Sequence, residues 1–262
     1  MGTGNFMPGP RSPVPGPDED HGLVDSGRQS ISVGIARTGG SYAVDTVDLE
    51  AYVARAVAGE GGDELPAAAL EALAITIRTW AEHNRGRHAD EGFDFCDLTH
   101  CLSLRAATTK SRAAAAATSG LRLYDEMTPA EVYLSASCGG HTEKPSMVWR
   151  GAKDRPYLPA QPDAVCVRGP GWVTEIPEPR VRQALLAAGL RGGPVRDLRV
   201  AARATSGRAR HLAVDGMVPE IVDAGAFRLA AGRVLGWQTI KSTLFQIERV
   251  AAGYRFTGRG IG

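Results

Sequence analysis

The sequence predicts an α+β fold built from antiparallel hairpins and short helices. Apolar and polar residues alternate as in β-strands at both ends of the domain, in Ser30–Ala36 and Phe245–Val250. Apolar residues recur at helical spacing in residues 49–57 and 70–80. Strands and helices do not follow one another in a regular β–α–β order, so a parallel α/β sheet is not expected.

The composition fits one globular domain with an aliphatic core and an N-terminal tail. Of the 262 residues, 43% are hydrophobic but only 6% are aromatic, so Ala, Val and Leu must fill most of the interior. The formal net charge of +1 gives no support for nucleic-acid binding. Residues 1–29 are rich in proline and contain an acidic run, so we expect a disordered tail, with the domain spanning residues 30–262.

The domain is predicted to begin with a β-hairpin that leads into a helix. The strand Ser30–Ala36 is followed by a Gly-Gly turn, and the return strand begins at Tyr42. Asp48 is a suitable N-cap for a helix with apolar residues on one face. This helix is expected to end at Glu60, immediately before another Gly-Gly pair.

The predicted elements continue in the same style to the end of the chain. A second helix begins near Pro66, and a third, rich in alanine, covers residues 108–119. Residues 121–124 and 131–136 are predicted to be paired strands. Further helices are expected over residues 181–190 and 224–235, and further strands over 198–204, 212–214, 245–250 and 254–257.

Reactive side chains are concentrated in two loops. Residues 93–101 read FDFCDLTHC and residues 135–143 read SASCGGHTE; together they hold three of the four cysteines and two of the six histidines. Loops that only connect elements do not need this chemistry, whereas metal sites, disulfides and active sites do. The two loops are therefore the strongest candidates for a functional site.

These loops, together with residues 49–60 and 70–80, resemble the stage II sporulation protein D family, whose domain is shared with proteins called amidase enhancers. The resemblance runs from about Ser30 to the last residue. It implies a bacterial protein of the cell envelope, outside the cytoplasm, that cleaves peptidoglycan glycan strands by lytic transglycosylation. In the family the final segment continues as Gly-His-Gly-Val-Gly, so we expect the chain to end inside this motif.

The resemblance and the chemistry together favour Glu60 as the catalytic acid/base. A lytic transglycosylase needs one carboxyl group, which protonates the leaving oxygen and then takes a proton from the sugar's own 6-hydroxyl. Partial burial at the end of an apolar helix would favour the protonated carboxyl. Glu64 is the alternative, because the family often has Glu, an apolar residue and Pro in succession. The non-functional interpretation of Glu60 is a solvated helix-end glutamate.

The first cysteine loop has the spacing of a metal site. Cys96 and Cys101 are separated by four residues, and His88 lies upstream. Members of the family bind zinc in this region, and these three side chains would supply three of the four ligands of a structural zinc ion. A disulfide between the two cysteines is the main alternative, and free thiols are the third.

Substrate-binding residues are predicted in both loops and on two flanking elements. The resemblance places Arg78 near the cleft, although a salt bridge to Glu50 or Glu71 would give it a structural role instead. Trp149 is the best candidate to stack on a sugar ring. The polar loop residues are expected to converge with Glu60 on one concave surface: Thr99, His100, Ser137, Gly139, Gly140 and His141.

Cys138 has several interpretations. The alternatives are a disulfide partner of Cys166, a corner of a second metal site, part of a glycan-contacting loop, and a thiol nucleophile beside His141.

For the whole protein, the expected partner is the glycan strand and not nucleic acid. One competing function is a non-catalytic wall-binding protein that stimulates an N-acetylmuramoyl-L-alanine amidase. Another is a metal-dependent hydrolase, which requires a zinc ion with an open coordination position.

Overall fold

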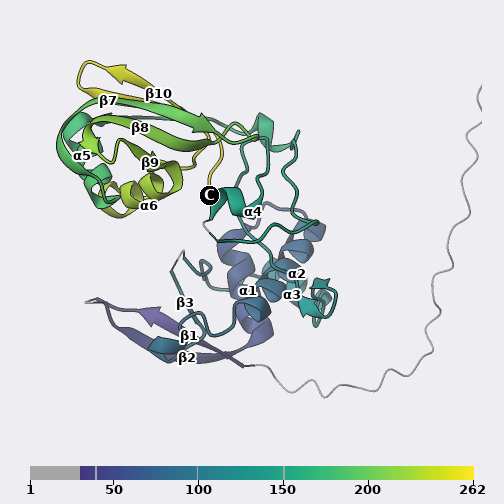
Figure 1. Ribbon diagram of the computed structural model, residues 1–262. Helices are drawn as coiled ribbons and strands as arrows, with labels where there is room; N and C mark the ends of the chain where they lie inside the picture. Colours follow the sequence, from purple (N-terminus) through teal and green to yellow (C-terminus); the bar gives the residue numbers. More distant parts are fainter. Residues whose placement is uncertain (1–29, 39, 99, 150) are drawn as a thin grey trace, which may run out of the picture. The chain divides into compact units, whose positions relative to one another are not determined.

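The computed structural model describes residues 30–38, 40–98, 100–149 and 151–262, so the predicted tail and Thr99 lie outside the described residues. The chain divides into two compact units, with the boundary between Val132 and Tyr133, where a single domain was expected. Both units combine helices with small sheets, and the predicted α+β class is confirmed (Figure 1). None of the helices in the described part of the chain has the length and apolarity needed to cross a bilayer.

The first unit contains a short three-stranded sheet and three helices. Its elements are β1 (Ser30–Ala36), β2 (Tyr42–Asp48), α1 (Leu49–Glu60), α2 (Ala67–His83), the 3-10 turn η1 (Ala89–Glu91), β3 (Phe95–Cys96), α3 (Thr109–Ala117), β4 (Tyr124–Asp125) and β5 (Thr128–Pro129). The sheet order is β2-β1-β3, with β1 and β2 antiparallel and β3 parallel to β1.

Local interactions explain how the hairpin and the helices position β3. The Asp48 carboxylate accepts a hydrogen bond from the backbone N–H of Glu50 at 2.9 Å, which caps α1 directly at the end of β2. Phe95 of β3 is fully buried and packs against Tyr52 of α1 and Trp80 of α2, with ring centroids 5.5 and 5.0 Å away. The short strand is therefore anchored by the core, and this anchor positions Cys96, the next residue.

The second unit has its own helices, sheets and hydrophobic core. Its elements are α4 (Pro145–Val148), η2 (Cys166–Arg168), β6 (Trp172–Pro177), α5 (Glu178–Ala187), β7 (Arg191–Arg203), β8 (Ala209–Val218), β9 (Ile221–Asp223), α6 (Ala224–Leu235), β10 (Phe245–Val250) and β11 (Gly253–Gly258). They form two three-stranded antiparallel sheets, ordered β7-β8-β9 and β10-β11-β6.

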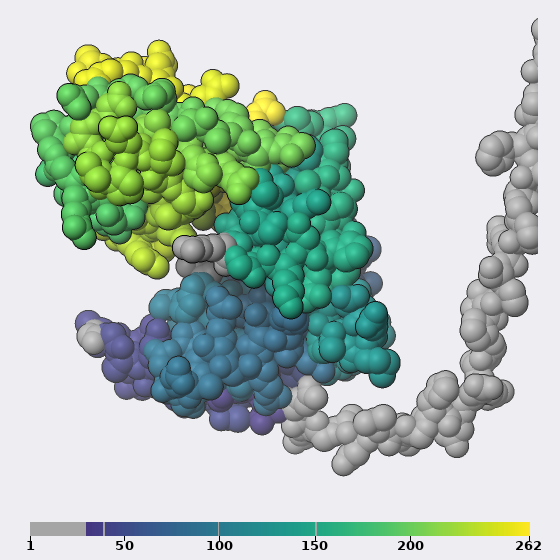
Figure 2. Space-filling model, in the orientation of Figure 1, coloured from purple at the N-terminus to yellow at the C-terminus, as the bar shows by residue number. Residues whose placement is uncertain are grey.

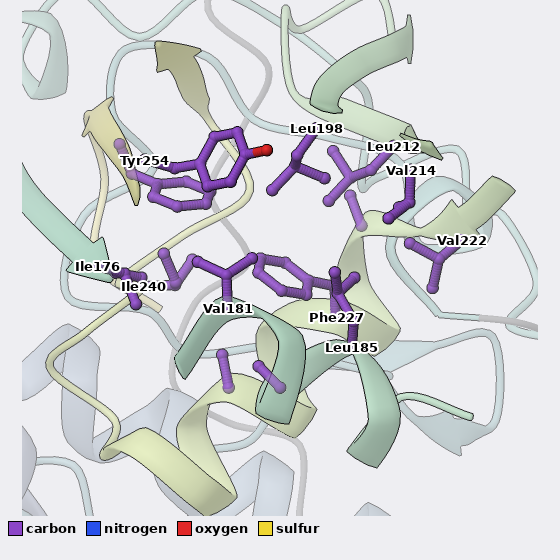
Figure 3. Close-up of a cluster of buried hydrophobic side chains, with 14 of the residues drawn as sticks. Ile176, Val181, Leu185, Leu198, Leu212, Val214, Val222, Phe227, Ile240 and Tyr254 are labelled. Atoms are coloured by element: carbon purple, nitrogen blue, oxygen red, sulfur yellow. The ribbon is translucent and has the colours of Figure 1, made fainter. Parts of the chain in front are cut away.

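The core of the second unit lies between helices α5 and α6 and the strands of its sheets. Figure 3 shows Leu185 of α5 and Phe227 of α6 directed toward the strand residues Leu212 and Tyr254. All four side chains are almost fully buried, so each contributes on the order of 1.5–3 kcal/mol of burial free energy. In Figure 2 the green and yellow side chains of this unit close over that core on the face that is drawn.

The prediction of paired strands over residues 121–124 and 131–136 is wrong. The only pairing here joins the two-residue strands β4 and β5, among the residues that the structure describes, and residues 131–136 form no strand. Side chains of α2 satisfy the upstream backbone instead: Arg78 donates to the Leu121 carbonyl at 3.0 Å, and the Leu123 N–H donates to Thr79 Oγ1 at 2.9 Å. These groups are then not available for a strand ladder.

Candidate functional site

Glu60 is the last residue of α1 and is held by a backbone amide. The N–H of Ser103 donates to its Oε1 at 2.7 Å, while Oε2 receives no hydrogen bond from the residues that the structure describes. The chain at Ser103 approaches the helix end so closely that a Cβ at Gly59 would lie 1.8 Å from the Ser103 carbonyl oxygen. The helix end and the segment after the first cysteine loop therefore fix this carboxylate together.

The expected partial burial of Glu60 is wrong, because its side chain is exposed. The carboxyl group extends beyond the apolar face of α1, which ends at Ala58. Glu64, the alternative, is also exposed, in the turn between α1 and α2, and its carboxylate folds back over Gly62. Among the described residues, no hydrogen-bond donor holds the carboxylate of Glu64. Of the two carboxylates, only Glu60 has a defined orientation.

Four side chains of the first cysteine loop and its upstream turn converge into one group that could bind a metal ion. The ligand atoms of His88, Cys96, His100 and Cys101 all lie within 4.8 Å of one another, and only His100 is exposed. The two Nε2 atoms of His88 and His100 are 2.8 Å apart, and Cys96 Sγ lies 3.5 Å from Nδ1 of His100. The N–H of Leu98 donates to Cys96 Sγ at 3.3 Å, as backbone amides do around metal-bound sulfur.

The donor set fits a metal ion. Glu91 pairs with Nδ1 of His88, which leaves Nε2 of the ring directed at the group. Burial lowers the pKa of His100, and the neighbouring His88 lowers it further, so the ring is neutral near neutral pH and able to act as a ligand. Burial also raises the pKa of the Cys101 thiol to about 12, a cost that a bound cation would reverse.

His100 is thus the fourth member of the group, whereas the sequence predicted that it binds substrate. Its position next to Cys101 was visible in the sequence, but adjacency alone does not tell which way a side chain points. Cys96 and Cys101 lie together as predicted, and all four cysteines of the chain are free thiols in this structure. The His and Cys residues of this group therefore could bind a metal ion.

Arg78 has the structural role that the sequence offered as its alternative. Its side chain is 0% exposed, so it cannot present its guanidinium to a ligand. It donates to both carboxylate oxygens of Glu50, through Nε at 2.8 Å and Nη2 at 2.6 Å. The remaining donors reach the carbonyls of Ala115 and Leu121 at 3.2 and 3.0 Å. Arg78 therefore ties α2 to α1, to α3 and to the chain that follows α3.

Replacing Arg78 with Met is expected to destabilise the chain by about 3 kcal/mol, because one partner of a buried ion pair is lost. This value is at the lower end of what losing one partner of a buried ion pair usually costs, because the side chain of Glu50 is 32% exposed. Chemical unfolding of the full chain measures the effect. Arg85→Met is the matched control: this arginine is 46% exposed beside Asp94 and should cost no more than about 1 kcal/mol. Equal costs in the two variants would contradict the structural role.

The second loop is held against the last residues of the chain. Ser137 exchanges two backbone hydrogen bonds with Ile261, both at 2.9 Å. Gly139 has a φ of +74°, and a Cβ at this position would meet the backbone nitrogen of Gly260 at 2.8 Å. Nδ1 of His141 lies 2.7 Å from the Thr142 carbonyl oxygen. The glycines are therefore required by the backbone itself, which explains the Gly-Gly pair without a ligand.

A pocket of about 630 Å³ lies in the second unit beside this loop. Ser137 and Trp149, both predicted to bind substrate, line it, whereas Gly139, Gly140 and His141 do not. Trp149 is 47% exposed and stacks on Tyr133, with ring centroids 4.3 Å apart. The wall of the pocket also includes Arg208 and Arg228, which the sequence did not single out. A single arginine just before a strand and another within a helix carry no sequence pattern that would have marked them.

The predicted single concave surface joins residues of both units. Glu60 and His100 belong to the first unit, and His141 belongs to the second. Convergence of these residues stays a prediction.

Comparison with known families bears on the first unit. Residues 37–124 match the model of a family described as Stage II sporulation protein. The match covers α1, α2 and the His88, Cys96, His100 and Cys101 group, and includes Glu60. No curated protein matches the chain. The first unit therefore contains a domain of the Stage II sporulation protein family, as the sequence motifs predicted.

Proposed function

We propose that this protein acts in the bacterial cell envelope and cleaves peptidoglycan glycan strands by lytic transglycosylation, with Glu60 as the single acid/base. The observation that carries the proposal is the exposure and the hydrogen bonding of Glu60, which lies within the family match. Its carboxylate is exposed, one oxygen is fixed by the Ser103 amide at 2.7 Å, and the other is free of protein partners among the described residues. A group that must exchange protons with a bound sugar needs both a fixed position and a free oxygen.

One carboxyl group is sufficient for both proton transfers of this reaction. Protonated Glu60 donates to the oxygen that links C1 of N-acetylmuramic acid to C4 of N-acetylglucosamine, and the C1–O bond breaks. The carboxylate then takes the proton of the 6-hydroxyl of the same muramic acid as that oxygen bonds to C1. The product carries a 1,6-anhydro ring, Glu60 is protonated again, and no water is consumed. A second, nucleophilic carboxylate is therefore unnecessary, in contrast to most glycosidases.

We infer that the His88, Cys96, His100 and Cys101 group holds a structural zinc ion. Two nitrogen and two sulfur ligands complete a tetrahedral shell and leave no open coordination position. A zinc ion in such a shell supplies folding free energy. Ser103, whose backbone amide donates to Glu60, follows Cys101 by two residues. A zinc ion bound to Cys101 would therefore also help to fix the position of the catalytic carboxylate. A hydrolase mechanism at this group is disfavoured by its filled shell.

The second candidate function is a wall-binding protein that stimulates an amidase. The pocket in the second unit favours it, because stacked and partly exposed aromatic rings suit sugar binding without catalysis. In that case the partners would be peptidoglycan and an N-acetylmuramoyl-L-alanine amidase.

Dye-labelled sacculi separate the two functions. We expect the protein alone to release soluble labelled glycan, either from intact sacculi or from strands that an amidase has first stripped of their peptides. Release from neither substrate, together with faster release by an added amidase, would contradict the proposal and support the wall-binding alternative.

A further inference from the structure

We propose that Cys138, Asp163 and Cys166 form a second metal site, in the second unit, for a thiophilic divalent cation such as Zn²⁺. The two sulfurs and a carboxylate oxygen lie within 4.8 Å of one another, and all three side chains are half-buried. The proposed glycan cleavage uses none of these residues, so the inference does not rest on that function.

The backbone brings the three residues together before any ion binds. The segments 138–142 and 161–167 run side by side, joined by hydrogen bonds from Asp163 N to the Gly140 carbonyl and from Thr142 N to the Gln161 carbonyl, both 2.9 Å. Gly140 has a φ of +106°, and a Cβ there would meet Val167 at 2.9 Å. This close approach brings the cysteine before the glycine pair next to the turn that carries Cys166.

Asp163 is oriented as a metal-binding carboxylate is. Its Oδ1 accepts hydrogen bonds from the N–H groups of Val165 at 2.9 Å and Cys166 at 3.1 Å. Its other oxygen, Oδ2, faces the thiols and lies 3.3 Å from Cys138 Sγ. One oxygen is thus held by the protein while the other is directed at the site, which is the usual way in which surrounding groups orient a monodentate ligand.

Two arginines provide the positive charge that such a ligand set requires. Nη2 of Arg208 donates to the Cys138 carbonyl at 2.7 Å, and Nη1 of Arg259 donates to the Val167 carbonyl at 2.8 Å. Binding releases both thiol protons to solvent, so two thiolates and one carboxylate would surround a divalent cation and leave one excess negative charge. The two guanidinium groups, bound to the backbone of the segments that carry the ligands, offset this excess.

The ligand types define the class of ion. Two thiolates and one carboxylate select a zinc-like cation over Mg²⁺ or Ca²⁺, which prefer oxygen ligands alone. The group has three protein ligands among the described residues, so a fourth position is left for water or another small ligand. A disulfide is less well matched to this site, because it would leave the oriented Asp163 carboxylate facing an uncharged pair of sulfurs.

Native mass spectrometry and elemental analysis of the full chain, purified with Zn²⁺, test the proposal. We expect two zinc ions per wild-type chain, one from each group, and one ion in Cys166→Ser and in Asp163→Asn. Asp154→Asn is the matched control and should keep both ions: its carboxylate also holds a backbone amide, that of Ser146 at 3.1 Å, but lies outside the group. Asp163→Asn preserves the side-chain shape in case the cysteine variant does not fold.

Other outcomes would overturn the second site. A wild-type chain with a single ion and a non-reduced mass two hydrogens lighter, a mass difference that Cys166→Ser abolishes, would show that Cys138 and Cys166 form a disulfide. A single ion that Asp163→Asn and Cys166→Ser both retain, with the thiols of Cys138 and Cys166 free to react in the wild type, would show that these two cysteines are a reduced pair without a metal. Two ions in Asp163→Asn and in Cys166→Ser would show that the second ion binds elsewhere.

Discussion

Glu60→Gln is expected to abolish glycan cleavage while leaving the fold intact. The loss should be about 10²–10⁴-fold, the usual contribution of a general acid/base. Glutamine keeps the length of the side chain, and its amide oxygen still accepts the Ser103 hydrogen bond, so only the exchangeable proton is removed. The rate is measured as 1,6-anhydro sugar released from purified glycan strands, with circular dichroism to show that the variant is folded.

Glu64→Gln is the matched control for this experiment. Glu64 lies four residues away, is also exposed, and has no donor to fix it among the described residues, so its replacement should leave most of the activity. Wild-type rates in Glu60→Gln would remove Glu60 from the mechanism. An inactive Glu64→Gln beside an active Glu60→Gln would show that the catalytic carboxyl is Glu64.

Replacing Cys96 and Cys101 together with Ser is expected to remove one zinc ion and to unfold the first unit. Structural zinc contributes on the order of 10 kcal/mol or more to the folding of small zinc-dependent domains. This contribution is as large as the total free energy of unfolding of many domains, which is about 5–15 kcal/mol. The second unit has its own core and should keep its thermal transition. Calorimetry with metal analysis measures both effects.

Cys138→Ser is the control for this change, because it removes a thiol from the other cysteine group and from the second unit only. It should leave the transition of the first unit in place. If the Cys96/Cys101 variant kept both its zinc content and its first transition, the structural role of this group would be refuted.

The strongly periodic and well-capped elements could be predicted from the sequence. The bounds of α1 were predicted from its apolar stripe and from Asp48, which does cap it. The predicted helix 224–235 is α6, with Asp223 as its N-cap. The expected pairing of residues 121–124 with 131–136 does not form, and side chains of α2, distant in sequence, bind the backbone of Leu121 and Leu123 instead. Local propensity carries no record of such contacts.

The candidate site was predictable where its parts are close in sequence. His88, Cys96 and Cys101 fall within one short segment, so the spacing and the family resemblance offered them as metal ligands, with a disulfide and free thiols as the alternatives. Asp163 was missed because it joins Cys138 across 25 residues, through a pairing of loops that no periodicity predicts. Arg78 was placed near a cleft although the structure buries it completely, since sequence alone does not distinguish a buried ion pair from an exposed one.

Cleavage of purified glycan in H₂¹⁸O distinguishes lytic transglycosylation from hydrolysis. A lytic transglycosylase closes the ring with the sugar's own 6-hydroxyl, so we expect products that end in 1,6-anhydro-N-acetylmuramic acid and contain no ¹⁸O. Mass spectrometry of the released fragments distinguishes these ends from hydrolysed ones. Reducing ends that carry one ¹⁸O atom would contradict the account, because they would show that water, and not the 6-hydroxyl, attacks the anomeric carbon.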